Sequence, residues 1–209
     1  MALKLQGSTS GSATFDVPAS VSGDINFTLP NSDGTAGQSL STNGSGILGW
    51  TSSPVSADYW FMNVSQTSAG TFTSWARPST PLADNSLNMT VSSGEFAFPS
   101  SGYYLITFSP EVVLDRTGFT SPGTDIQLQM YIQSNSAFTE VQRYTLPHVP
   151  DQVIRAHPTM NYLAKVPDNL VGAAKVMFTI SGGLSSTTSY VAGGSLGWST
   201  ATFIRLGNV

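Results

Sequence analysis

The chain of 209 residues contains no cysteine, little charge and no long apolar run. Without cysteine there are no disulfides, so we expect packing or subunit association to supply the stability. Charged residues make up 10% of the chain and the net charge is −4. This balance gives no basic surface for nucleic acid. No stretch approaches the roughly 18 apolar residues that span a bilayer, so we expect no membrane insertion.

Alternating apolar residues surround a proline–glycine break within residues 94–114. Phe96 and Phe98 alternate with small or polar residues before the break, and the alternation resumes after it. A period of two with aromatic residues is typical of strands with one buried face. Pro99 lacks a main-chain donor and Gly102 tolerates positive φ, so the break predicts a hairpin. The expected core or interface residues are Phe96, Phe98, Tyr104, Ile106 and Phe108.

Similar alternation recurs along the chain, and no amphipathic helix of useful length interrupts it. Many short strands separated by turn signals indicate an all-β sandwich. The expected strands cover residues 59–64, 72–75, 87–91, 95–98, 103–114, 126–133, 138–146, 154–166, 175–180 and 196–206.

Residues 1–56 differ in texture from the remainder. Their strands carry only two or three apolar residues each, between turn dipeptides at Asp33-Gly34 and Asn43-Gly44. Ordering a backbone costs about 1–2 kcal/mol per residue, which so thin a set of strands does not offset alone. We therefore expect a stalk or attachment domain at residues 1–56, packed on copies of itself or on a partner, and a sandwich domain at residues 57–209.

The pattern Phe-x-Phe-Pro-x-x-Gly-x-Tyr-x-Ile-x-Phe resembles the globular heads of the complement and tumour-necrosis-factor-like jelly rolls. The last strand, Trp198-Ser-Thr-Ala-Thr-Phe203-Ile-Arg-Leu206, is similar to the final strand of that family, which usually contains a Ser-Thr-Phe before an apolar finish. The resemblance covers roughly residues 58–209. It implies a jelly-roll knob that assembles as a homotrimer.

A second resemblance covers residues 1–52. Phe27-Thr-Leu-Pro and the run from Asp33 to Trp50 resemble repeat-like segments of bacteriophage tail-fibre and virion proteins, those of cyanophages especially. This resemblance implies a virion structural protein made in the host cytoplasm. Residues 1–56 would then contact other virion proteins, and the knob would adhere to a host-surface glycan or protein. A head-decoration (cement) trimer of the capsid is the rival interpretation.

Scattered carboxylates and two histidines are the remaining chemical groups. A glycan-degrading enzyme would need two convergent carboxylates, but the spacing places the available ones in loops or at solvent-facing strand positions. His148 and His157 each adjoin a proline and do not form a zinc pattern; residues 31–34 favour a hairpin turn over a calcium loop. We expect no enzyme and no metal or other cofactor, with a glycan-degrading enzyme and a free lectin-like binder as alternatives. The available carboxylates are Glu111, Asp115, Asp125, Glu140 and Asp151.

Strand reversals predict where contacts form. Because successive connections of a sandwich alternate between its ends, residues 115–124, 147–153 and 181–197 collect at the end away from residues 1–56. Residues 182–194 are expected to form an exposed, adaptable loop. Aromatic residues on strands 59–64 and 103–114 are expected in the core or, on the opposite strand face, at a subunit interface. The contact candidates are Arg116, Phe119, His148, Asp151 and Tyr190.

Overall fold

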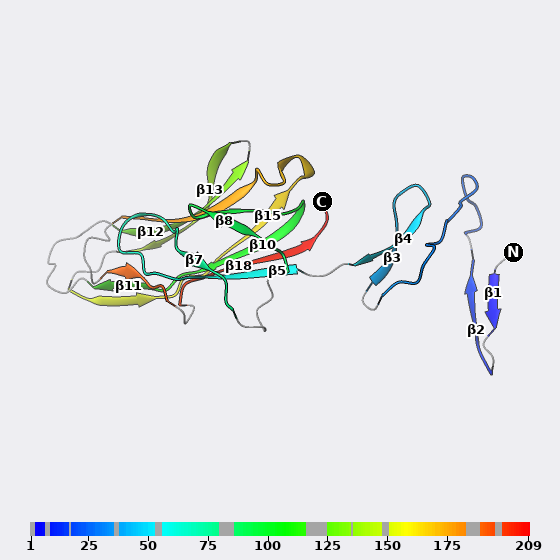
Figure 1. The fold of residues 1–209 in the computed structure, drawn as a ribbon, viewed down its shortest axis with the longest axis horizontal. Helices are drawn as coiled ribbons and strands as arrows, with labels where there is room; N and C mark the ends of the chain where they lie inside the picture. Colours follow the sequence, from blue (N-terminus) through cyan, green and yellow to red (C-terminus); the bar gives the residue numbers. More distant parts are fainter. Residues whose placement is uncertain are drawn as a thin grey trace. The chain divides into compact units, whose positions relative to one another are not determined.

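A computed structural model describes residues 3–6, 9–16, 18–35, 38–52, 56–79, 86–115, 125–134, 136–147, 151–182, 189–194 and 198–209. The chain forms two compact units, Met1–Pro54 and Val55–Val209 (Figure 1). The division falls before residue 56, which the sequence analysis assigned to the first domain. Ser56 belongs to the second unit because it begins strand β5 and pairs with Arg205.

The first unit consists of two antiparallel hairpins and an extended segment. β1 (Leu3–Gln6) pairs with β2 (Ser12–Phe15), and β3 (Gln38–Thr42) pairs with β4 (Leu48–Ser52). The hairpin turn predicted at residues 31–34 is wrong, since this stretch joins no pair of strands. Instead, the Trp50 ring covers Gly34, and its Nε1 donates to the Ser32 carbonyl at 2.9 Å.

Two antiparallel sheets make up most of the second unit. The five-stranded sheet has the order β15 (Met160–Val166), β10 (Gly102–Ser109), β18 (Thr200–Gly207), β5 (Ser56–Met62) and β7 (Trp75–Ala76). The six-stranded sheet has the order β13 (Ala137–Leu146), β12 (Ile126–Ser134), β16 (Lys175–Ser181), β9 (Glu95–Ala97) and β8 (Thr90–Ser92), with β6 (Gly70–Thr71) on β16. The long strands interleave in the order of a jelly roll.

Prolines interrupt two strands that the sequence analysis treated as continuous. Pro110 separates β10 from β11 (Val112–Asp115), and Pro158 separates β14 (Val153–Ala156) from β15. β11 pairs with β14 and with β17 (Tyr190–Val191) in a separate three-stranded sheet. The helical structure in the described residues is one 3-10 turn, η1 (Asp168–Leu170), and none of these residues lies in a helix long and apolar enough to cross a membrane.

The hairpin predicted within residues 94–114 is wrong. β9 pairs with β16 and β8, whereas β10 pairs with β15 and β18. Residues 99–101 therefore cross from one sheet to the other. Because of this crossing, the aromatic residues before the break face those after it across the core. The centroids of the Phe98 and Tyr104 rings, for example, lie 4.8 Å apart.

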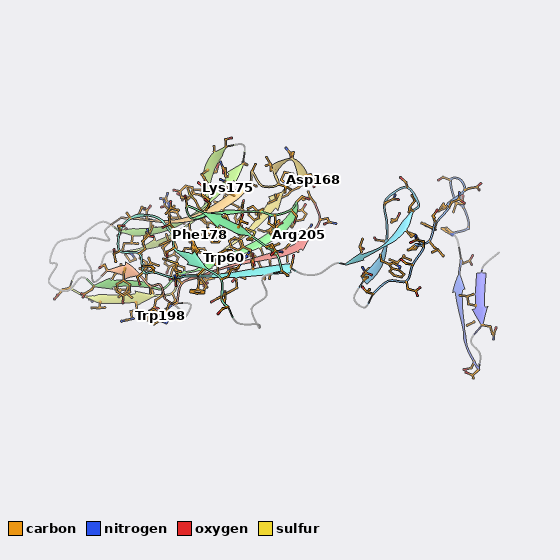
Figure 2. All side chains as sticks on the ribbon, in the orientation of Figure 1. Trp60, Asp168, Lys175, Phe178, Trp198 and Arg205 are labelled. Carbon is orange, nitrogen blue, oxygen red and sulfur yellow. The ribbon has the colours of Figure 1, made fainter. Side chains whose placement is uncertain are left out.

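Aromatic side chains fill the space between the sheets. Phe178 of β16 stacks on Phe108 of β10 at 4.3 Å, and the Trp75 and Phe96 rings meet edge to face at 5.2 Å. Figure 2 shows Phe178 and Trp60 within this part of the sandwich. The five residues expected in the core or an interface have no exposed surface: Phe96, Phe98, Tyr104, Ile106 and Phe108.

Candidate functional site

The outer face of the five-stranded sheet is rich in apolar side chains. Along β5 the alternation sends Asp58, Trp60 and Met62 into the core. The residues between them point outward, and the strand register places them beside outward residues of β18, β10 and β15. We call this surface the apolar sheet face: Tyr59, Phe61, Tyr103, Leu105, Leu163 and Ile204.

This face divides the aromatic residues that the sequence analysis considered together. Trp60 and Tyr104 lie in the core, whereas Tyr59, Phe61 and Tyr103 point outward. Burial raises the pKa of Tyr59 above its ordinary value. Alternation of core and outer positions explains the split, since adjacent strand residues face opposite sides.

Little charge accompanies the apolar sheet face. Lys165 lies at its edge, with Nζ 5.9 Å from the Tyr103 ring. Leu163 remains 57% exposed and Tyr103 37% exposed. Fully burying one such side chain contributes about 1.5–3 kcal/mol, so covering several of them would stabilise an assembly substantially.

The outer face of the other large sheet carries a hydrogen-bonded polar network. The Glu140 carboxylate accepts two bonds from Arg143, each 2.7 Å long, and others from Gln129 and Tyr131. These bonds, those from Arg143 foremost, hold the pKa of Glu140 below its ordinary value. Burial and the nearby Glu140 charge raise the pKa of Tyr131. The two sheet faces thus differ in chemistry.

One end of the sandwich collects the strand ends that flank the predicted contact loops. Asp115 pairs with Val153, and β16 ends at Ser181 on this side. Ser56 begins β5 at the opposite end, where it pairs with Arg205. We call the first of these the loop end of the second unit.

The five predicted contact residues fall into two groups. Asp151 and Tyr190 are described and lie at the loop end, Asp151 exposed before β14 and Tyr190 half-buried in β17. The other three, Arg116, Phe119 and His148, lie outside the described residues.

The prediction of an exposed, adaptable loop is wrong for residues 189–194. Ser189, Val191 and Ala192 are buried. Gln66 and Val191 exchange two main-chain hydrogen bonds of 2.9 Å, and a side chain at Gly193 would meet the main chain of Val64. This close packing holds Tyr190 in a fixed strand. β17 has only two residues, which is too few for an alternating pattern to predict a strand.

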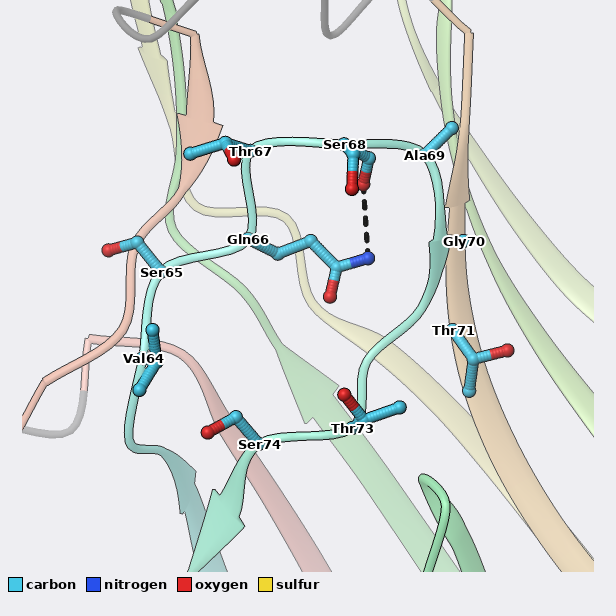
Figure 3. A pocket seen from close by; sticks show the side chains of 10 residues that line it. All are labelled: Val64, Ser65, Gln66, Thr67, Ser68, Ala69, Gly70, Thr71, Thr73 and Ser74. Atoms are coloured by element: carbon cyan, nitrogen blue, oxygen red, sulfur yellow. Dashed lines mark hydrogen bonds between the residues drawn. The ribbon is translucent and has the colours of Figure 1, made fainter.

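A polar pocket of about 490 Å³ lies within the connection from β5 to β7 (Figure 3). Gln66 extends across it, and its Nε2 donates to the Ser68 carbonyl at 3.0 Å. The alternation of apolar residues gives no sign of this pocket, although residues 64–74 are rich in serine and threonine. The groups offered are hydroxyls and one amide, suited to a neutral ligand with several hydroxyls. The lining residues are Val64, Ser65, Gln66, Thr67, Ser68, Ala69, Gly70, Thr71, Thr73 and Ser74.

Two of the acidic side chains considered for catalysis are paired with arginines. Glu140 pairs with Arg143, as described above. Glu111 lies in the connection between β10 and β11, in keeping with the expected loop position, but it is buried there. Its Oε1 lies 3.3 Å from Arg155 Nη1 and 4.0 Å from His157 Nε2. Within the described residues, no three His, Cys, Asp or Glu side chains are grouped closely enough to hold a metal ion.

Comparison with known proteins yields a similarity of fold. No family model matches the sequence, and no curated protein matches it either. Solved structures do match, among them the TNF-like protein of the "Structure of Eiger TNF from S. frugiperda". It is 10% identical with a TM-score of 0.47, and 75% of this chain and 95% of that chain are covered. The jelly roll of the second unit is defined by its own strand order.

Proposed function

We infer that the chain is a structural component of a bacteriophage particle, a homotrimeric fibre or appendage whose knob mediates adhesion to the host surface. The resemblance of residues 1–52 to tail-fibre segments supports the proposal that the chain belongs to a bacteriophage particle. The apolar sheet face supports the homotrimer, because six apolar side chains lie together on it and two of them, Tyr103 and Leu163, remain exposed.

Adhesion is assigned to the loop end of the knob. The strand ends that flank the predicted contact loops meet there, and binding proteins often carry their contact residues on loops that join the strands of a scaffold. Three copies would present three loop ends, and multivalency would raise a weak single-site affinity. The contact residues proposed are Arg116, Phe119, His148, Asp151 and Tyr190.

The oligomer is tested by placing a charge on the apolar sheet face. Leu105→Lys should give a monomer by light scattering at micromolar concentration, because burying an unpaired ammonium group is costly. Gln127→Lys is the matched control, since Gln127 belongs to the outward row of β12 in the other large sheet. The control and the unmodified chain should both have the mass of a trimer. A monomeric unmodified chain contradicts the proposal.

The position on the particle and the adhesion need separate measurements. Electron microscopy of particles labelled at the C-terminus should place the label on a fibre or appendage; a label distributed over the capsid shell would favour the decoration protein.

Replacing Arg116, Phe119 and Tyr190 together by alanine should abolish attachment while the trimer persists. Undiminished attachment by this variant would remove the adhesion role.

A further inference from the structure

Residues 25–29 of the first unit, which we call the extended segment, lie outside the regular strands and contact the β3–β4 hairpin through one isolated bridge. Thr28 forms a parallel bridge with Ile47. Its N–H donates to Gly46 at 2.9 Å, and its carbonyl accepts from Leu48 at 2.8 Å. Both main-chain groups of Thr28 therefore point toward the β3–β4 hairpin.

The residues on either side of Thr28 point their main-chain groups the other way. In an extended chain, successive residues direct N–H and C=O to opposite edges. Among the described residues, none forms a main-chain hydrogen bond to Phe27 or Leu29. These groups form an open edge, which is a template for another strand.

The side chains of the same segment are equally unpartnered. Ile25, Phe27 and Leu29 alternate along it and are 63%, 62% and 70% exposed. The bridge at Ile47 places them on the same sheet face as Leu40 and Trp50, which pair with each other across the hairpin. Among the residues of the first unit whose side chains the structure describes, none is buried.

A second edge of this small sheet is open in part. The N–H of Gln38, at the start of β3, donates to the Thr35 carbonyl at 3.1 Å, so the proposal uses the edge from Leu40 onward. The strand order is the extended segment, then β4, then β3, and β3 has β4 as its partner among the described strands. The extended segment runs parallel to β4, and β3 runs antiparallel to it. A β3 strand from another copy would therefore meet the extended segment in antiparallel orientation.

We propose that the open edge at Phe27 and Leu29 pairs with the outer edge of β3 in a second copy of this chain, which closes a ring of copies and buries their apolar faces together. The inference rests on the homo-oligomer proposed above and specifies how its first unit assembles. Two different edges on one chain produce a head-to-tail contact, which closes into a ring when the rotation permits. Little charge opposes the association of copies, because residues 18–35 and 38–52 carry only Asp24 and Asp33 as charged groups.

Disulfide cross-linking of the full chain tests this pairing, because the chain has no cysteine of its own. Phe27→Cys combined with Gln38→Cys, Leu40→Cys or Thr42→Cys places both thiols on the same sheet face. Oxidation should convert at least one of these variants into covalently linked oligomers. Bonds between chains are distinguished from a bond within one chain by the higher mass on non-reducing electrophoresis. This readout matters most for the Thr42→Cys variant, because Phe27 and Thr42 of one chain line the same pocket.

Matched controls combine Phe27→Cys with Ser39→Cys or Ser41→Cys, whose side chains face the opposite side of the sheet. These controls should stay unlinked. Hydrogen exchange on the unmodified chain gives a second measurement, in which the Phe27 and Leu29 amides should be protected.

The outcomes separate this inference from the proposed function. A trimeric chain in which no same-face pair cross-links and both amides exchange like free peptide overturns the edge pairing and leaves the homotrimer intact. A monomeric chain overturns both. Cross-linking of the opposite-face controls as fast as the same-face pairs also overturns the pairing.

Discussion

Tyr104 combines an aromatic core contact with a fixed hydroxyl group. Its ring has no exposed surface, and its hydroxyl donates to the Ser100 carbonyl at 2.6 Å. Tyr104→Ala should lower the free energy of unfolding by about 3–5 kcal/mol, because it leaves a cavity beside Phe98. Tyr104→Phe keeps the ring and should cost about 1 kcal/mol. Denaturant unfolding measures both variants. An equal loss of unfolding free energy in the two would mean that the hydroxyl group, rather than the ring, supplies the stability.

The Glu140–Arg143 pair predicts a dependence of stability on pH. Because the folded-state pKa of Glu140 is lowered, its stabilisation is present above the ordinary glutamate pKa and is lost as pH falls through the folded value. The difference in unfolding free energy between the unmodified chain and Glu140→Gln should therefore shrink on acidification.

Arg143→Gln is the matched variant for this pH measurement, because it removes the group that lowers the pKa most. The Arg143→Gln variant should therefore show a weaker dependence of unfolding free energy on pH in the acid range. A difference between the unmodified chain and Glu140→Gln that stays constant through the acid range contradicts the assignment.

At the scale of elements, period-two alternation predicted most long strands of the jelly roll. The alternation of Val176, Phe178 and Ile180 identifies β16, and the same pattern identifies β10. Alternation reports which residues are buried but not which sheet they join, and so the crossing at residues 99–101 was mistaken for a hairpin. Short elements such as β17 leave too few residues for a pattern.

The candidate sites were predictable only in part. A sequence shows that Tyr59 and Trp60 occupy opposite faces of one strand, but it does not show which face meets the other sheet. Burial of Trp60 settles that choice. Glu111 is paired with Arg155, which lies 44 residues away in the chain. A pair so distant in sequence leaves no pattern in the residues around Glu111 from which it could be predicted.

For the whole molecule, the two units should differ in their ability to fold alone. The second unit has a continuous aromatic core, whereas none of the first-unit side chains that the structure describes is buried. Residues 56–209 should fold alone with a cooperative thermal transition, because the core belongs to them. Residues 1–54 alone at low concentration should give the circular dichroism of an unfolded chain. A cooperative transition for the isolated first unit would contradict this division.

The pairing of β5 with β18 has a mechanical consequence. The chain enters the second unit at Ser56, and the strands run antiparallel from there toward the loop end, with Phe61 opposite Thr200. A tension applied between residue 56 and a surface held by the loop end acts along β5. The hydrogen bonds of the ladder lie across the strands, so this tension loads them together in shear rather than opening them one after another. A domain pulled in this direction resists a larger force than one whose terminal strand is peeled from its edge.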